Sequence, residues 1–191
     1  MFESVLTHYP EVPALGGLPK KLVVMLHGLG SDGHDLISLV PYLQPSLTDC
    51  HFISPHAVEP YDMAPFGRQW FSSRDRSHKV VVSHLEKNIP LINDLISQKQ
   101  KELGLGNRDT VLLGFSQGTM TAVYMALVAE EPYAAVIGFS GRLIQPAELV
   151  NKATPICLIH GMADEVVLSE DTENLAKYCI TNGIKCEKLL I

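Results

Sequence analysis

The sequence predicts one α/β domain, with a mostly parallel sheet and helices on both of its faces. Short apolar runs alternate with longer amphipathic segments along all 191 residues. Most of the apolar runs are rich in Leu or β-branched residues without clean alternation, as is typical of parallel strands buried on both faces. A chain of this length forms one full core, and no internal repeat or low-complexity linker divides residues 1–191.

Six apolar runs are the predicted strands. They span residues 21–26, 51–54, 110–114, 134–139, 155–160 and 184–191. The predicted helices span residues 34–43, 79–103, 117–131 and 169–182. Gly104 and Gly183 stand where a helix C-terminus favours glycine. Pro90 is expected to kink or divide the second helix, because proline lacks the N–H of a helical hydrogen bond.

Residues 57–77 form one long connection rich in Pro, Met and aromatic residues. A loop of that length in a compact domain is usually functional or disordered. Within it, Arg68 and Arg74 are either contacts for a charged head group or ordinary surface arginines.

Charge, hydropathy and cysteine spacing limit the partners and the cellular location that the sequence predicts. The formal net charge is −6, and no basic run exceeds the pair Lys20-Lys21, which argues against nucleic acid. The N-terminus lacks the pattern of a signal peptide, and no apolar stretch is long enough for a transmembrane segment. The four cysteines show no C-x-x-C spacing, so we expect reduced thiols in a cytoplasmic protein.

The loop after the first predicted strand, 27–33, reads HGLGSDG and contains G-x-G-x-x-G. A dinucleotide-binding loop would require an acidic residue at the end of the next strand, whereas Asp49 precedes that strand. An HGxG loop can instead present a backbone N–H, here that of Leu29, to an oxyanion. A plain tight turn is the third interpretation.

The second loop, 114–118, reads GFSQG between a strand and a helix. This G-x-S-x-G pattern favours Ser116 as a nucleophile exposed on a sharp turn. The N–H of Gln117, at the start of the helix, can stabilise a negative oxygen. The simpler alternative is that Ser116 only caps the helix.

The third loop follows the fifth strand and reads HGMADEVV, residues 160–167. Asp164 fits the acid of a Ser…Asp…His order, in which it would orient a histidine. Glu165 is a weaker candidate for that role, and a solvated loop aspartate is the alternative.

Together, the three loops resemble those of the carboxylesterase/phospholipase (acyl-protein thioesterase-like) family of small α/β-hydrolases, in the right order from Leu22 to Ile191. The resemblance implies hydrolysis of small acyl esters or thioesters through an acyl-serine, without metal or cofactor. It places the nucleophile on Ser116, the acid on Asp164, and the oxyanion amides on Leu29 and Gln117.

Residues 68–71, RQWF, also resemble the family's aromatic segment beside the acyl site. Trp70 and Phe71 are therefore expected to bind substrate, or else to pin the long loop to the domain.

The catalytic base departs from this pattern. The sequence has eight histidines, none of them after Asp164, whereas in the family the base follows the last strand. His27 and His160 are more simply read as local hydrogen-bonding residues. We therefore expect residues 1–191 to lack the segment with the catalytic histidine and the last helix. Without that histidine, hydrolysis would be impaired. Without that helix, one face of the sheet would be exposed and could form a homodimer interface. The alternative function is that of a non-catalytic acyl-binding homologue.

Overall fold

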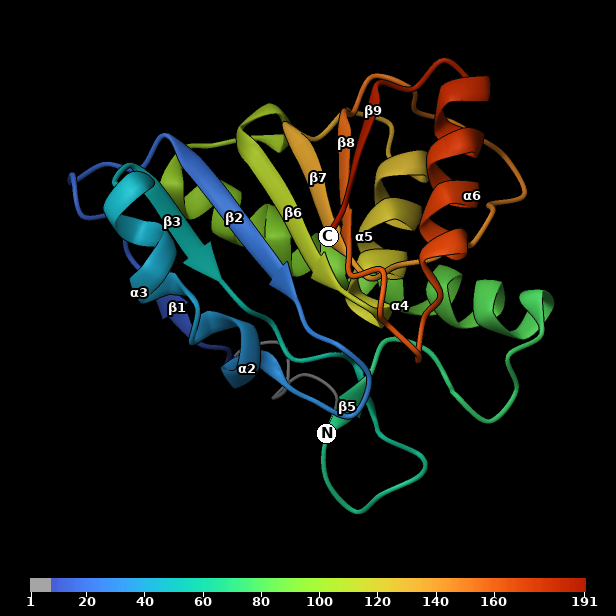
Figure 1. Cartoon of the computed structure of the whole chain (residues 1–191). Coiled ribbons are helices and arrows are strands. Elements are labelled where there is room, and N and C mark those ends of the chain that lie inside the picture. Colours follow the sequence, from blue (N-terminus) through green and yellow to red (C-terminus); the bar gives the residue numbers. More distant parts are fainter. Residues whose placement is uncertain (1–7) are drawn as a thin grey trace.

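The structure, a computed structural model, describes residues 8–191 (Figure 1). Its main sheet has the strand order β1-β3-β2-β6-β7-β8-β9, and every neighbouring pair is parallel except β1 with β3. The strands are β1 (Glu11–Val12), β2 (Lys21–Leu26), β3 (Cys50–Ile53), β6 (Thr110–Phe115), β7 (Ala135–Phe139), β8 (Ile156–His160) and β9 (Cys186–Leu190). The mostly parallel α/β sheet predicted from the sequence is confirmed. Among the described strands of the main sheet, only the two-residue strand β1 has no counterpart among the predicted runs.

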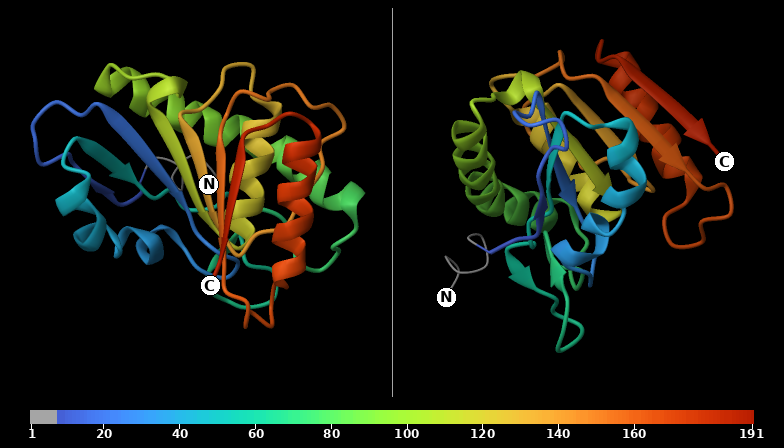
Figure 2. Two further views of the ribbon diagram at one scale, coloured as in Figure 1. Left: turned by 45° about the horizontal axis from the view of Figure 1, so that its top comes forward. Right: turned by 90° about the vertical axis from the view of Figure 1, so that its left-hand side faces the viewer.

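Helices cover both faces of this sheet (Figure 2). One face carries α4 (His78–Leu103), α5 (Gln117–Val128) and α6 (Ser169–Thr181), and the larger hydrophobic core lies beneath them. The other face carries α2 (Gly33–Ile37) and α3 (Val40–Leu43) over a smaller core beside β2 and β3. The short 3-10 turns are η1 (Gln44–Ser46) and η2 (Asn107–Asp109). None of the helices in residues 8–191 is long and apolar enough to cross a membrane.

Proline and glycine explain three of the helix boundaries. The predicted helix 34–43 is two helices, and Pro41 stands in the first turn of α3, where its missing N–H costs nothing. Pro90 does not divide α4, which runs unbroken from His78 to Leu103. Gly104 and Gly183 both have positive φ, 69° and 78°, at the C-terminal ends of α4 and α6, as predicted.

The long connection 57–77 contains two short strands that the sequence pattern did not reveal. These are β4 (Glu59–Pro60) and β5 (Arg68–Gln69), which pair antiparallel. Two residues are too few for any alternation of apolar and polar positions to be recognised. The hairpin is tied to the 28–31 loop, since Gly30 N–H donates to Arg68 O at 2.9 Å and Arg68 N–H donates to Ser31 O at 2.8 Å.

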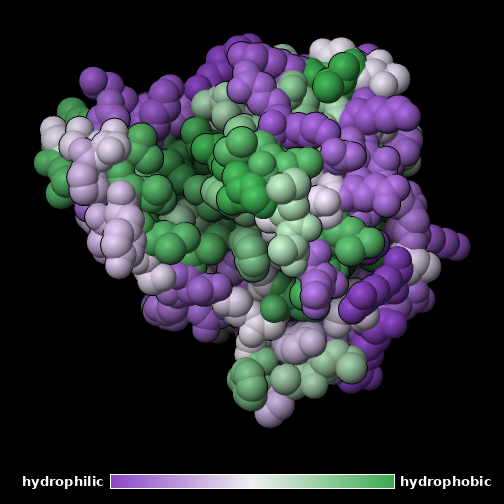
Figure 3. Space-filling view, in the orientation of Figure 1, coloured by the Kyte–Doolittle hydropathy of each residue, from purple (hydrophilic) through white to green (hydrophobic). Residues whose placement is uncertain are grey.

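Half of the sheet is incompletely covered on the side of α2 and α3. On this side β6 to β9 present half-buried or exposed apolar side chains, and Phe115 and Leu189 are 43% and 54% exposed. We call this region the open sheet face; it comprises Phe115, Ile137, Phe139, Ile159 and Leu189. Figure 3 shows a hollow, largely apolar area on the side of the molecule seen in Figure 1.

Candidate active site

Ser116 lies on a strained turn between β6 and α5. Its φ of 51° and ψ of −113° are unusual for an L-residue, and its N–H donates to Phe139 O at 2.8 Å. The side chain makes no capping hydrogen bond to α5. Within residues 8–191 the half-buried hydroxyl has no hydrogen-bond partner, so it is free to meet a ligand.

The two glycines that flank Ser116 are needed for backbone contact. A Cβ on Gly118 would lie 1.9 Å from Leu26 O, and a Cβ on Gly114 would lie 2.5 Å from the Thr119 nitrogen. Such distances are not sterically possible, so only glycine lets α5 begin directly against the end of β2. The two glycines of the G-x-S-x-G pattern are therefore required because the backbone packs closely on either side of Ser116, at Gly114 against the start of α5 and at Gly118 against the start of the 27–33 loop.

His27 holds that neighbouring loop from inside the core. Ala57 N–H donates to Nε2 at 3.0 Å, so the proton is on Nδ1, which donates to Gly28 O at 2.8 Å. Burial lowers the pKa of His27 to about 4. The ring is fully buried, neutral and engaged at both nitrogens, which leaves no nitrogen available to accept a proton from Ser116.

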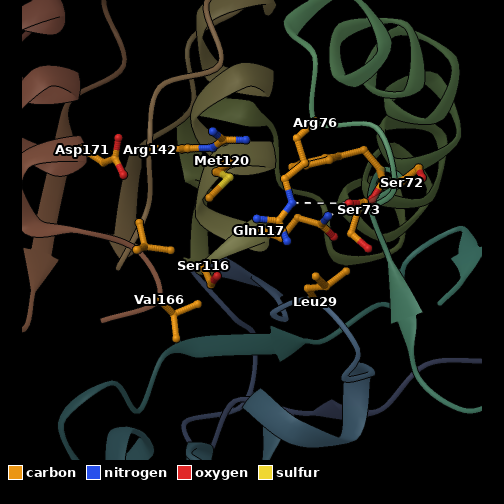
Figure 4. Close-up of a pocket in the computed structure, with 12 residues that line it drawn as sticks. Leu29, Ser72, Ser73, Arg76, Ser116, Gln117, Met120, Arg142, Val166 and Asp171 are labelled. Atoms are coloured by element: carbon orange, nitrogen blue, oxygen red, sulfur yellow. Dashed lines mark hydrogen bonds between the residues drawn. The ribbon is translucent and has the colours of Figure 1, made fainter. Parts of the chain in front are cut away.

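Leu29 and Gln117, the two residues whose backbone amides are expected to bind an oxyanion, line the same pocket as Ser116 (Figure 4). Leu29 N–H has no hydrogen-bond partner within residues 8–191. Gln117 is the first residue of α5, so its N–H has no acceptor in the helix and lies at the positive end of the helix dipole. Two free donors beside one free hydroxyl are the groups that an acyl-transfer site requires.

The pocket around Ser116 combines apolar, hydroxyl and charged side chains. Its lining comes from the 27–33 loop, the 57–77 connection, the start of α5, the segment after β7, and the segment before α6. The lining residues are Leu29, Phe71, Ser72, Ser73, Arg76, Ser116, Gln117, Met120, Arg142, Val166, Val167 and Asp171. Sequence reasoning missed Arg142, because it stands in a segment without a motif.

Asp164 is fixed by its own loop, next to this pocket. Its Oδ1 accepts from the N–H groups of Val166 at 2.9 Å and Val167 at 3.0 Å. These backbone hydrogen bonds, with that to Val167 as the strongest cause, hold the pKa of Asp164 below its ordinary value. The carboxylate is 21% exposed and does not itself line the pocket, whereas Val166 and Val167 do.

His160 is buried beside Asp164, and both of its ring nitrogens have partners. Its Nε2 lies 2.8 Å from Val167 O and 3.4 Å from Asp164 Oδ2, and its Nδ1 lies 2.6 Å from the Thr172 hydroxyl. Among the residues that the structure describes, no histidine lines the Ser116 pocket. Ser116, the Asp164 loop and the residues Leu29 and Gln117 thus meet at one pocket, with no described histidine in its lining.

Trp70 and Phe71 occupy different places. Phe71 lines the pocket, whereas Trp70 is fully buried behind it and donates from Nε1 to His27 O at 2.8 Å. The carboxamide of Gln117 holds both: Trp70 N–H donates to Oε1, and Nε2 donates to Phe71 O, each at 2.8 Å. Nothing in the sequence pattern indicated this role of the Gln117 side chain.

Comparison with known proteins gives one consistent match. Residues 7–190 match the model of a family described as Phospholipase/Carboxylesterase. Esterase YpfH of Escherichia coli K12 is 31% identical over 159 residues, which cover 83% of this chain and 66% of that protein. Acyl-protein thioesterase 1 of Neurospora crassa is 32% identical over 165 residues, which cover 76% and 67%. The chain thus spans about two thirds of the length of these relatives.

Solved structures agree with this match. A crystal structure of esterase PE8 superposes with a TM-score of 0.89 at 36% identity, covering 96% of this chain and 87% of that one. A Bacillus cereus carboxylesterase shares the fold, with a TM-score of 0.77 at 16% identity, covering 95% and 83%. The fold is therefore that of the α/β-hydrolases.

Proposed function

Because the chain belongs to the phospholipase/carboxylesterase family, we propose that it hydrolyses carboxylic esters or thioesters through an acyl-serine intermediate. The observation that supports this proposal is the meeting of three groups in one pocket. They are the free Ser116 hydroxyl and the free backbone amides of Leu29 and Gln117.

In the proposed reaction, Ser116 Oγ attacks the carbonyl carbon of the substrate and loses its proton to a base. The carbonyl oxygen becomes an oxyanion, which accepts hydrogen bonds from Leu29 and Gln117 N–H. Collapse of this intermediate breaks the bond to the alcohol or thiol, which leaves with a proton. Water then attacks the acyl-serine in the same way and releases the carboxylic acid.

We assign the base to a histidine outside residues 8–191, oriented by Asp164. This assignment rests on the described histidines, of which none lines the pocket. The two that belong to the three loops, His27 and His160, are engaged at both nitrogens. Loss of the histidine costs about 10⁶ in kcat in a serine protease, and the oxyanion hole and binding keep about 10³–10⁴ over water. Residues 1–191 alone should therefore turn over slowly.

A second candidate function follows from the same observation. A pocket with a free serine and no base would bind acyl compounds without hydrolysing them. This non-catalytic acyl-binding function predicts saturable binding of a short-chain ester without turnover that depends on Ser116.

The test is hydrolysis of p-nitrophenyl butyrate by residues 1–191, with Ser116→Ala and Ser97→Ala, an exposed serine of α4, as variant and control. Slow hydrolysis that Ser116→Ala abolishes and Ser97→Ala retains supports an esterase that awaits its base. Fast hydrolysis that depends on Ser116 keeps the esterase and overturns the assignment of the base. Binding without such turnover supports the second function, and neither binding nor turnover overturns both.

A further inference from the structure

Arg142 lines the Ser116 pocket without any partner of its own. It follows β7, in the segment that leads away from the sheet toward β8, and its side chain is half-buried. It makes no hydrogen bond or ion pair with any residue in 8–191. Figure 4 shows it extending past Met120 into the pocket, away from Asp171.

The other arginines of this region differ from Arg142 in this respect. Arg68 donates to the carbonyls of Ala57 and Val58, and Arg74 donates to Asp62 O. Arg76 also lines the pocket but is exposed and donates to Ser73 O at 3.3 Å. A guanidinium is always charged and carries five N–H donors, and all five of Arg142 lack protein partners within residues 8–191 and are available to a ligand.

The side chains that line the pocket include more positive than negative groups. Its lining includes two arginines, Arg76 and Arg142, and one carboxylate, Asp171. Asp171 forms no ion pair within 4.0 Å of either arginine among the described residues. The side chains that line the pocket therefore carry one positive charge in excess.

The backbone beside Arg142 is held in place. Gly141 O accepts a hydrogen bond from the buried Thr172 hydroxyl at 2.9 Å. A Cβ on Gly141 would lie 2.2 Å from Thr119 Cγ2, so α5 packs directly against this segment. The guanidinium is thus presented from a fixed point between α5 and α6, as a preorganised binding group requires.

We propose that Arg142 binds an anionic group of the substrate, so that this pocket selects esters or thioesters carrying a carboxylate or phosphate near the scissile carbonyl. The inference rests on the proposed function, because it specifies the substrate class of the same site. Planar carboxylate and phosphate oxygens match the two parallel N–H groups of a guanidinium. Apolar contacts with Met120 and Val167 would hold the chain between that anion and the ester.

The test compares charged and neutral esters in pairs that share the reacting ester and differ at the anionic group. For an anion on the acyl side, the pair is mono-p-nitrophenyl glutarate and p-nitrophenyl butyrate. For an anion on the leaving group, the pair is 4-(butyryloxy)benzoate and its methyl ester. The readout is the ratio of kcat/KM for the charged ester to that for the neutral ester, measured for residues 1–191 with Arg142→Gln, Arg142→Lys and the control Arg108→Gln in η2.

In at least one pair, the original chain should favour the charged ester, and Arg142→Gln should reduce the ratio by roughly tenfold to a hundredfold, mainly through KM. Arg142→Lys should restore part of the ratio, and Arg108→Gln should leave it unchanged. The pair that responds identifies the side of the ester that carries the anion. Ratios that stay the same in all variants for both pairs overturn the inference, while leaving the esterase function intact.

A binding experiment separates the inference from the proposed function. Ser116→Ala protein is titrated with monomethyl glutarate and with methyl butyrate in a calorimeter, with and without Arg142→Gln. Binding of the charged compound that requires Arg142 supports the anion site even if no ester is hydrolysed. Equal binding of both compounds, or binding that Arg142→Gln does not weaken, overturns it. Matching thermal unfolding curves show that the variants are folded.

Discussion

The Gln117 carboxamide accepts a hydrogen bond from the Trp70 amide at 2.8 Å and, through Nε2, donates to Phe71 O at the same distance. Gln117, the residue after Ser116, therefore lines the pocket and binds the 57–77 connection with its side chain. Through these two bonds, the turn that holds Ser116 and the segment that forms one wall of the pocket are a single unit.

Gln117→Glu tests this coupling with almost no change in shape. The glutamate can still accept from Trp70 N–H, but its second oxygen would face Phe71 O without a proton to donate. We expect a loss of about 1–3 kcal/mol in the free energy of unfolding, measured by urea titration. Gln98→Glu, at an exposed position of α4, is the control and should lie within about 0.5 kcal/mol of the original. A Gln117→Glu protein of unchanged stability would show that the bridge does not hold the connection.

Gly118→Ala tests the contact between the serine turn and β2. The added methyl group would lie 1.9 Å from Leu26 O, so either the start of α5 or the end of β2 must move. We expect the free energy of unfolding to fall by more than about 3 kcal/mol. Gly106→Ala is the matched control, because a Cβ there meets nothing within 4 Å and its φ of −137° suits any residue. Equal stability of the two variants would contradict the packing described for Gly118.

The sequence revealed the backbone of this site better than its side chains. Glycine spacing around Ser116 reports a steric requirement of the main chain, so it could be recognised without any knowledge of neighbours. The bonds of Gln117 to Trp70 and Phe71 join positions that are 47 and 46 residues apart, and no local pattern encodes them. Arg142 has no motif either: its significance depends on the absence of a partner, which only the folded structure can show.

The sequence pattern predicts helix boundaries less well where local preference and tertiary packing favour different structures. Pro90 is an unfavourable helix residue, yet α4 continues through it, since residues on either side, such as Leu85 and Ile92, are buried in the larger core. Packing over the length of a helix outweighs the loss of one hydrogen bond.

His27 makes stability depend on pH. In the folded state its pKa is lowered to about 4, while in the unfolded chain the imidazole has its ordinary value of about 6.5. Below pH 6.5 the unfolded chain therefore binds a proton that the folded protein does not, and stability falls as the pH drops toward 4. We expect this residue to account for a loss of about 2 kcal/mol between pH 7 and pH 4.5.

The measurement is urea unfolding of the original chain and of His27→Gln at both pH values. The difference between the two proteins cancels the contribution of other titrating groups. The variant should be less stable at pH 7 but should lose less stability on acidification. If both proteins lose the same amount, His27 is not the group responsible.

The open sheet face predicts self-association of residues 1–191. Leu189 is 54% exposed on β9, next to the half-buried Ile159 of β8, and such contiguous apolar surface favours contact with another molecule. In sedimentation velocity we expect a concentration-dependent species larger than the monomer, and Leu189→Lys should shift it toward the monomer. Leu18→Lys removes a leucine that is 90% exposed elsewhere and should not change the distribution. Monomeric behaviour of the original chain at all concentrations would contradict this prediction.

The close contacts of Thr119 with Gly138 and Gly141 restrict which substitutions the backbone near Ser116 can accept. Its methyl group lies 2.4 Å and 2.2 Å from the positions that a Cβ would take on Gly138 and Gly141. These are contacts of a side chain with bare main chain, so no neighbouring side chain can shrink to compensate for a larger residue. Arg142, one position along, points into the pocket and can be exchanged without touching them. A substitution at position 142 can therefore change the lining of the pocket while the backbone that positions Ser116 stays the same.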